Sequence, residues 1–175
     1  MIYFIRHGQT NWNAQQLIQG QTNIPLNDVG IAQAQQMAQS LQDITFDKVF
    51  CSPLDRALQT CKAVVDADQI TIDNRLIERD FGEFEGQSLQ LMLTHGFWNA
   101  NFPQNYDHAE SLFDAINRVY SFLDEISQNH PHKNVLIVAH GGVGMIVQSY
   151  FHGKPQDGDY LTYLVKNCQV LTFEN

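Results

Sequence analysis

Long hydrophobic runs are missing from this sequence. No apolar stretch approaches the roughly 20 residues that a helix needs to span a bilayer. The apolar run at the start is closed by Arg6 after four residues, and no basic region precedes it. We therefore expect neither a signal peptide nor a transmembrane segment, and no membrane partner.

Positive charge is also scarce. The 175 residues include 10 Lys and Arg against 19 Asp and Glu, a net charge of -9, and no Lys or Arg lies between Asp80 and Asn117. An acidic chain of this kind lacks the basic surface that binding to nucleic acid or to an anionic membrane requires. A place where several of the few cations gather is therefore informative.

Cysteines are few, and nucleotide and metal motifs are missing. Cys51, Cys61 and Cys168 are widely spaced within apolar segments, and we expect them to be reduced core thiols of a cytoplasmic protein. None of them lies in the basic, glycine-rich context that activates a cysteine. The chain has no Walker-type glycine loop and no acidic metal-binding triplet, so we expect neither a cofactor nor a metal.

Alternating strand and helix patterns predict the fold. Apolar, β-prone runs predict strands at 1–5, 49–52, 70–72 and 135–139. Helical patterns lie between and after them, following Asn27, Pro53, Ser88, Ser111 and Gly142. This alternation is typical of class α/β, and we expect residues 1–175 to form a single three-layer α/β/α domain with a mostly parallel sheet.

The end of the chain predicts antiparallel strands. The apolar segments 160–165 and 168–173 flank Lys166 and Asn167, a spacing that indicates a terminal β-hairpin. Its outer edge would be either free or paired across a homodimer, so the oligomeric state stays open.

Two of the predicted strands end in the same way. The first runs into Arg6 and His7, and the fourth runs into His140 and Gly141. Open α/β sheets bind their ligands at the carboxyl ends of their strands, and Gly8 allows the chain to turn there. One histidine after a strand would most simply be structural. Two such histidines, one beside an arginine, indicate a shared site.

Arg56 belongs to the same predicted edge. It lies in the first turn of the helix after Pro53, close to the end of the second strand. Arginine forks match phosphate oxygens, and glycine-rich turns that lead into helices add backbone N–H donors. Although a helix arginine is usually solvated, its position near Arg6 favours an anion site with a phosphoryl group as the ligand.

Phosphoryl transfer without a metal needs a nucleophile from the protein. A neutral imidazole nitrogen can serve if its ring is held in the right tautomer. The cations would stabilise the charge that spreads over the equatorial oxygens. A carboxylic acid would protonate the leaving alcohol and then activate water. In the acidic loop 78–86, we expect Asp80, Glu83 and Glu85 to be solvated or to cap local backbone.

With these motifs the sequence resembles the histidine phosphatase superfamily, in its phosphoglycerate-mutase-like branch, over nearly the whole chain. Residues 6–10, Arg-His-Gly-Gln-Thr, resemble its opening motif, with Gln9 in place of the usual Glu. Residues 52–60 resemble its second-arginine motif and residues 78–86 its acid loop. Further matching segments are Glu110-Ser111, Arg118 and the His-Gly-Gly of 140–142. Leu17 departs from the pattern, because relatives often carry Arg there.

The resemblance implies a role for each matching residue. His7 would be the phosphorylated nucleophile, and Glu78 would be the general acid and base. Arg6, Arg56 and His140 would clamp the phosphoryl group. The resemblance implies further phosphate or substrate contacts at Asn13, Gln19, Gly20 and Gly141.

The family contains both phosphatases and cofactor-dependent phosphoglycerate mutases. Its mutases carry a longer insertion after the acid loop, with basic residues that face the substrate. Here the stretch between Arg79 and Arg118 is short and has no cation; it offers the aromatic residues Phe97, Trp98, Phe102 and Tyr106. We therefore expect a metal-independent phosphomonoesterase for small phosphorylated metabolites, with a poorly charged or apolar leaving group. A phosphoglycerate mutase and a non-catalytic phosphate-binding module are the two alternatives.

Overall fold

In the described part of the chain, five strands and six α-helices alternate. The computed structural model describes residues 1–103 and 107–174, so Tyr106 lies outside the described residues. The strands are β1 (Ile2–Arg6), β2 (Lys48–Cys51), β3 (Ile70–Ile72), β4 (Val135–Ala139) and β5 (Val170–Phe173). The helices are α1 (Asn11–Ala14), α2 (Asp28–Ser40), α3 (Asp55–Cys61), α4 (Gln90–Thr94), α5 (Leu112–Asn129) and α6 (Gly141–His152).

The strands form one sheet in the order β3-β2-β4-β1-β5. The first four of these strands are parallel to one another, and β5 pairs antiparallel with β1. All five residues of the central strand β4 are buried, as expected for a parallel strand covered on both faces. The prediction of a mostly parallel α/β sheet with an antiparallel strand at the end is confirmed.

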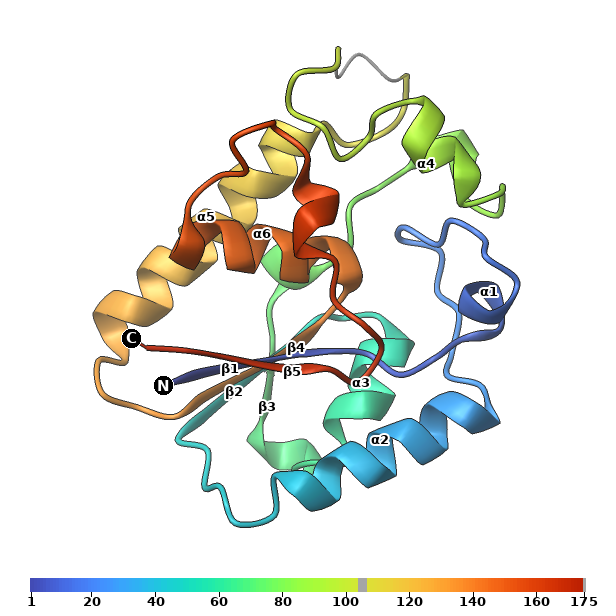
Figure 1. The fold of residues 1–175 in the computed structure, drawn as a ribbon. Helices are drawn as coiled ribbons and strands as arrows, with labels where there is room; N and C mark the ends of the chain where they lie inside the picture. Colours follow the sequence, from blue (N-terminus) through green and yellow to red (C-terminus); the bar gives the residue numbers. More distant parts are fainter. Residues whose placement is uncertain (104–106, 175) are drawn as a thin grey trace.

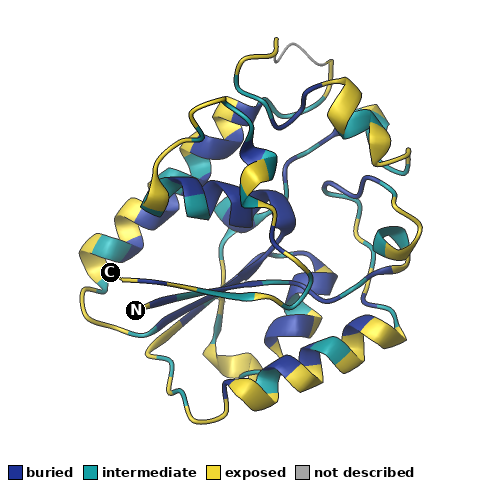
Figure 2. Cartoon of the chain, viewed as in Figure 1, coloured by how far each residue is buried: buried dark blue, intermediate teal, exposed yellow. Residues whose placement is uncertain are grey.

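Helices cover both faces of the sheet (Figure 1). Alternate residues of β4 belong to two separate apolar clusters, because successive side chains of a strand point to opposite faces. Val135 and Ile137 pack in the cluster that holds α5 and α6. Leu136 and Val138 pack with side chains of α2 and α3. Figure 2 shows α2 and α5 buried toward the sheet and exposed on the outside, whereas α6 is buried on nearly all sides.

The predicted terminal hairpin is wrong in its first arm. Tyr160–Tyr163 forms a 3₁₀ helix that packs against α6, and only β5 enters the sheet. β5 pairs directly with β1, so that Ile2 lies opposite Phe173. The sequence of the first arm alternates like that of a strand. Tyr160, however, is 1% exposed because it packs in the space beside α6. Tertiary packing therefore overrode the local strand pattern.

The remaining expectations concern thiols and membranes. Cys51 and Cys61 are free and buried, as predicted for core residues, whereas Cys168 is only partly buried. The pKa of Cys51 is raised by its contact with the Cys61 thiol and by burial. Cys51 therefore stays a protonated thiol. Within the described residues, none of the helices is both long and apolar enough to cross a membrane.

Candidate active site

The register of β1 against β4 brings the two histidines together. Arg6 lies opposite Ala139, and the N–H of His7 donates to the Ala139 carbonyl at 2.9 Å. The next residue of each strand end is therefore a histidine, and the ring centroids of His7 and His140 lie 5.2 Å apart. The sequence prediction of two neighbouring imidazoles at one sheet edge is confirmed.

A backbone contact selects the tautomer of His7. Its Nδ1 lies 2.7 Å from the carbonyl oxygen of Gly8, which can only accept a hydrogen bond. The proton of the neutral ring is therefore on Nδ1, and the lone pair is on Nε2. His7 is 3% exposed and lines a cavity of about 600 Å³.

Gly8 is needed for close packing. Gly8 is not among the glycines with a positive φ, so the turn there does not need the backbone freedom for which glycine was expected. A Cβ at Gly8 would lie 2.5 Å from the backbone oxygen of Gly30 in α2. The Gly8 N–H donates to the Thr60 hydroxyl at 3.0 Å, and that hydroxyl donates to the Arg56 carbonyl at 2.8 Å. These contacts fix the loop of His7 against two helices.

Arg56 is fully buried at the start of α3, although helix arginines are usually solvated. Its two Nη groups donate to the carbonyls of Gly20 at 2.6 Å and Thr22 at 2.9 Å. Burial lowers the pKa of the guanidinium to about 10, so Arg56 still carries its charge at pH 7. Arg6 is held in a similar way, because its Nη1 donates to the Val165 carbonyl at 2.6 Å.

Three buried nitrogen atoms around His7 have no hydrogen-bond partner in the described part of the chain. They are Nε of Arg6, Nε of Arg56 and Nδ1 of His140. Buried polar groups are nearly always paired, and an unpaired one costs about 1–3 kcal/mol. An anion with several acceptor oxygens, such as a phosphoryl group, satisfies donors of this kind.

The Ser52 hydroxyl pairs with one of the two ring nitrogens of His140. The Nε2 of His140 lies 2.6 Å from the Ser52 hydroxyl, and the same oxygen accepts the Leu54 N–H at 3.4 Å. A Ser52 hydroxyl that donates to Nε2 leaves the proton of the neutral ring on Nδ1, the atom without a partner. His140 is 0% exposed and is not among the residues that line the cavity, so it lies behind His7.

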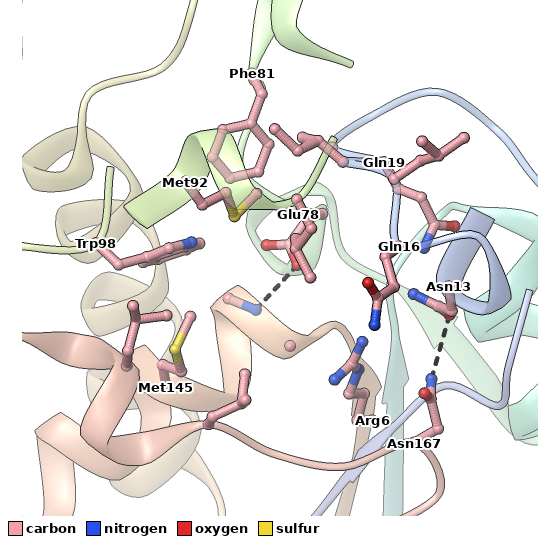
Figure 3. A pocket seen from close by; sticks show the side chains of 18 of the residues that line it. Arg6, Asn13, Gln16, Gln19, Glu78, Phe81, Met92, Trp98, Met145 and Asn167 are labelled. Atoms are coloured by element: carbon pink, nitrogen blue, oxygen red, sulfur yellow. Dashed lines mark hydrogen bonds between the residues drawn. The ribbon is translucent and has the colours of Figure 1, made fainter. Parts of the chain in front are cut away.

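Glu78 is held at the start of α6. Its Oε1 accepts the N–H of Arg79 at 2.8 Å, and its Oε2 accepts the N–H of Gly142 at 2.9 Å (Figure 3). A Cβ at Gly142 would lie 2.4 Å from the Glu78 carboxylate and 2.3 Å from the Trp98 ring. The second glycine after His140 therefore makes room for the acid. Glu78 lines the same cavity as His7, as the proposed acid must.

The four residues expected to make further phosphate or substrate contacts line the cavity in different ways. The Gln19 amide oxygen accepts the Thr10 hydroxyl at 2.8 Å, while Gly20 uses its carbonyl to hold Arg56. The Asn13 amide oxygen accepts the Thr10 N–H at 3.1 Å. Gly141 also lines the cavity, and a Cβ there would lie 3.3 Å from the Arg6 guanidinium. The structure thus places all four residues at the site.

Two contributors were missed in the sequence. Asn167 donates from Nδ2 to the His7 carbonyl at 2.9 Å and lies 3.4 Å from the Asn13 amide oxygen. It comes from the turn before β5, 160 residues beyond His7, and no local signal marks it. The Glu85 carboxylate accepts the N–H groups of Gln21 at 2.8 Å and Thr22 at 2.7 Å. Instead of capping only local backbone, it shapes the loop that holds Arg56.

Comparison with known proteins agrees with this geometry. The family model of the histidine phosphatase superfamily (branch 1) matches residues 2–174. The chain belongs to the histidine phosphatase superfamily. A phosphohistidine intermediate is general in this family, and relatives named as phosphatases support a phosphoric monoester hydrolase, so the predicted class of enzyme is confirmed.

Relatives of this histidine phosphatase carry several names. The uncharacterized phosphatase PhoE of Bacillus subtilis is 36% identical over 143 residues, 80% of this chain and 71% of that protein. The probable phosphoglycerate mutase GpmB of Yersinia pestis is 29% identical over 181 residues, 97% of this chain and 82% of that protein. Among solved structures, the alpha-ribazole phosphatase of Shigella flexneri superposes with a TM-score of 0.80 at 28% identity, covering 97% of this chain and 87% of that one.

Both site histidines of this histidine phosphatase are neutral at pH 7. Burial lowers the pKa of His7 well below the ordinary value of 6.5, and the charges of Arg56 and Arg6 lower it further. The pKa of His140 is lowered in the same direction by burial, then by Arg56 and His7. Nε2 of His7 therefore keeps the lone pair that an attack on phosphorus requires.

These two histidines should make the fold sensitive to acid. Below about pH 6.5 they bind protons in the unfolded chain but stay neutral in the folded one, so the free energy of unfolding falls as the pH falls. In the pH range where a histidine is protonated only in the unfolded chain, it lowers the free energy of unfolding by up to about 1.4 kcal/mol for each pH unit of acidification. Urea unfolding in phosphate-free buffer measures the free energy of unfolding as a function of pH. The double variant His7→Asn, His140→Asn should show a smaller dependence on pH than the wild type. Equal dependence would contradict the lowered pKa values of the two histidines.

Arg79 fixes the wall of the cavity beside Glu78. It is 0% exposed, its Nε donates to the Glu110 carbonyl at 2.8 Å, and its Nη1 donates to the Phe97 carbonyl. Its guanidinium carbon lies 5.4 Å from the ring centroid of Phe81, 5.5 Å from Phe97 and 5.3 Å from Trp98. One cation therefore holds three aromatic rings and the backbone next to the acid.

Replacement of Arg79 by methionine should destabilise the fold by about 3 kcal/mol, because two buried carbonyls lose a charged donor. Arg75→Met is the matched control, since the Arg75 side chain is 29% exposed where it pairs with Asp73 and Glu125, and ion pairs open to solvent contribute about 0–1 kcal/mol. Chemical unfolding of both variants measures the difference. Equal losses would contradict the structural role given to Arg79.

Proposed function

We propose that this enzyme hydrolyses small phosphomonoesters without a metal, through a phosphohistidine on Nε2 of His7. The observation that carries this proposal is the cluster of unpaired buried nitrogens from Arg6, Arg56 and His140 around a neutral imidazole of fixed tautomer. Arg6 and Arg56 line the cavity and can neutralise the equatorial oxygens of the phosphoryl group during transfer, while His140 lies behind His7.

The reaction has two balanced steps. In the first, the Nε2 lone pair of His7 attacks phosphorus, the ester P–O bond breaks, and Glu78 gives its proton to the leaving alkoxide. In the second, Glu78 takes a proton from water as the water oxygen attacks phosphorus, and the P–N bond breaks to return neutral His7 and inorganic phosphate. The position of Glu78 in the same cavity as His7 supports both roles.

The phosphoglycerate mutase alternative has the names of relatives such as GpmB in its favour. A mutase must hold a second negatively charged group of its substrate. Among the cavity-lining residues the positive side chains are Arg6 and Arg56, and each is already assigned to the transferred phosphoryl group. This distribution favours the phosphatase. The retained nucleophile and acid speak against a non-catalytic phosphate-binding module.

One assay separates these alternatives. The wild-type protein is incubated with p-nitrophenyl phosphate in the presence of EDTA, and then with 3-phosphoglycerate plus 2,3-bisphosphoglycerate. We expect phosphate release in EDTA, with slow or no isomer conversion. Activity that requires added metal would refute the mechanism, and faster isomer conversion than phosphate release would assign the protein as a mutase.

We also propose a cytoplasmic location. The buried free thiols of Cys51 and Cys61 support it, because unpaired cysteines are typical of reducing compartments. Fractionation of the native host cells with an antibody against this chain tests the location.

A further inference from the structure

The cavity beyond the phosphoryl site has two unlike walls (Figure 3). One wall carries the large apolar side chains of Phe81, Met92, Trp98 and Met145. The facing side carries the uncharged amides of Asn13, Gln16, Gln19 and Asn167, and the apolar Leu17 and Ile18 also line the cavity. A leaving group in this space would meet hydrocarbon on one side and neutral hydrogen-bonding groups on the other.

Charge in the cavity is confined to the reaction centre. Its charged lining residues are Arg6, Arg56 and Glu78. Nη groups of both arginines are already bonded to backbone carbonyls. A carboxylate on the leaving group would therefore approach Glu78 with no further cation to balance it, and the sequence offers no Lys or Arg from Asp80 to Asn117 that could supply one.

Several apolar side chains of the lining are left open to water. Leu89 is 45% exposed, Leu93 is 56% exposed and Leu164 is 60% exposed, although all three line the cavity. Large apolar side chains gathered at the mouth of a cavity gain free energy when a hydrophobic ligand covers them. Leu17 lines the same cavity and adds a further apolar side chain to it.

We propose that the preferred substrates are phosphate monoesters of uncharged, largely apolar alcohols, and that carboxylate-bearing phosphates are disfavoured. This inference rests on the proposed phosphatase activity and specifies its leaving group. The apolar wall and the exposed leucines bind the alcohol, while the arginine and histidine cluster binds the phosphoryl group. The amide wall accommodates a hydroxyl or ether oxygen at one edge of the alcohol.

A series of n-alkyl phosphates tests the apolar wall. Primary alkanols have nearly the same leaving-group basicity, so differences in kcat/KM report binding of the chain rather than chemistry. Each added methylene that is buried should raise kcat/KM about fourfold, from ethyl phosphate upward, until the cavity is filled. A flat or falling series would overturn the inference.

A matched pair of esters tests the exclusion of charge. Hexyl phosphate and the phosphate ester of 6-hydroxyhexanoate share one chain length and nearly one leaving group, and differ in a terminal carboxylate. We expect kcat/KM to be at least about tenfold lower for the carboxylate. Equal or higher kcat/KM for the carboxylate would overturn the inference. Failure to release phosphate from any ester, including p-nitrophenyl phosphate, would instead refute the proposed phosphatase.

A variant tests whether the apolar lining of the cavity causes the preference for uncharged leaving groups. Leu93→Lys places a cation at the mouth of the cavity, and it should shift the ratio of the two hexyl esters toward the carboxylate by about tenfold. Val29→Lys is the control, because Val29 is 52% exposed on α2 and does not line the cavity; its ratio should equal that of the wild type. The same shift in both variants, or in neither, would contradict the assignment of the wall.

Discussion

Replacement of His7 by alanine should lower kcat/KM for p-nitrophenyl phosphate by about 10⁴-fold or more. His7 is the one histidine among the described residues that line the cavity, and the variant loses its imidazole while the arginines and Glu78 stay in place. Loss of an activated nucleophile leaves only the catalysis that binding and charge stabilisation provide. Steady-state kinetics in EDTA measures the effect.

His140→Ala is the informative partner of that variant. His140 lies behind His7, and its Nδ1 is one of the three buried nitrogens without a partner in the described part of the chain, so its loss should lower kcat/KM by about 10²–10³-fold. Circular dichroism and thermal unfolding would establish that both variants are folded. Should His7→Ala retain activity within tenfold of the wild type, or should His140→Ala be the more damaged of the two, the assignment of the nucleophile would be wrong.

Replacement of Glu78 by glutamine should have an effect that depends on the leaving group. An alkoxide needs a proton as it leaves, so kcat/KM for an alkyl phosphate should fall by about 10²–10⁴-fold. Nitrophenolate is a much weaker base and leaves without one, so kcat/KM for p-nitrophenyl phosphate should fall far less. A plot of kcat/KM against leaving-group pKa should therefore be steeper for Glu78→Gln than for the wild type.

The second step supplies an independent test of the same residue. Without Glu78 to activate water, the phosphorylated enzyme should accumulate, so p-nitrophenyl phosphate should give a burst of nitrophenol followed by slow turnover. Asp80→Asn is a suitable control, because Asp80 lies on the same loop and its carboxylate accepts the Gly82 N–H rather than lining the cavity. Parallel plots for Glu78→Gln and the wild type would exclude Glu78 as the acid.

The two site histidines, His7 and His140, could be predicted from the sequence, because the pattern of an apolar strand followed by histidine indicates both the residue type and its place at the sheet edge. Two apolar strands that each end in a histidine must place those histidines side by side if the strands pair in register. The structure has this register, with Arg6 opposite Ala139. Arg56 was predicted in the same way, from its place in the first turn after a strand.

The parts that escaped prediction depend on contacts between distant segments. Asn167 reaches the His7 carbonyl because β5 pairs with β1, whereas the expected hairpin would have used this residue as a surface turn. The sequence does not distinguish Glu85 from the other acids on its loop, because its role depends on contacts with Gly20 and Thr22 that exist only in the folded chain. A Cβ at Gly20 would lie 1.9 Å from the Glu85 carboxylate, a closeness that no local pattern encodes.

The covalent intermediate is the claim on which the rest depends. Rapid mixing of the wild-type enzyme with ³²P-labelled phenyl phosphate, followed by quenching in alkali and peptide mapping, tests it most directly. We predict an alkali-stable, acid-labile label on the peptide that contains His7, attached through Nε2. Label on the His140 peptide, or turnover with no labelled protein at any mixing time, would contradict the account.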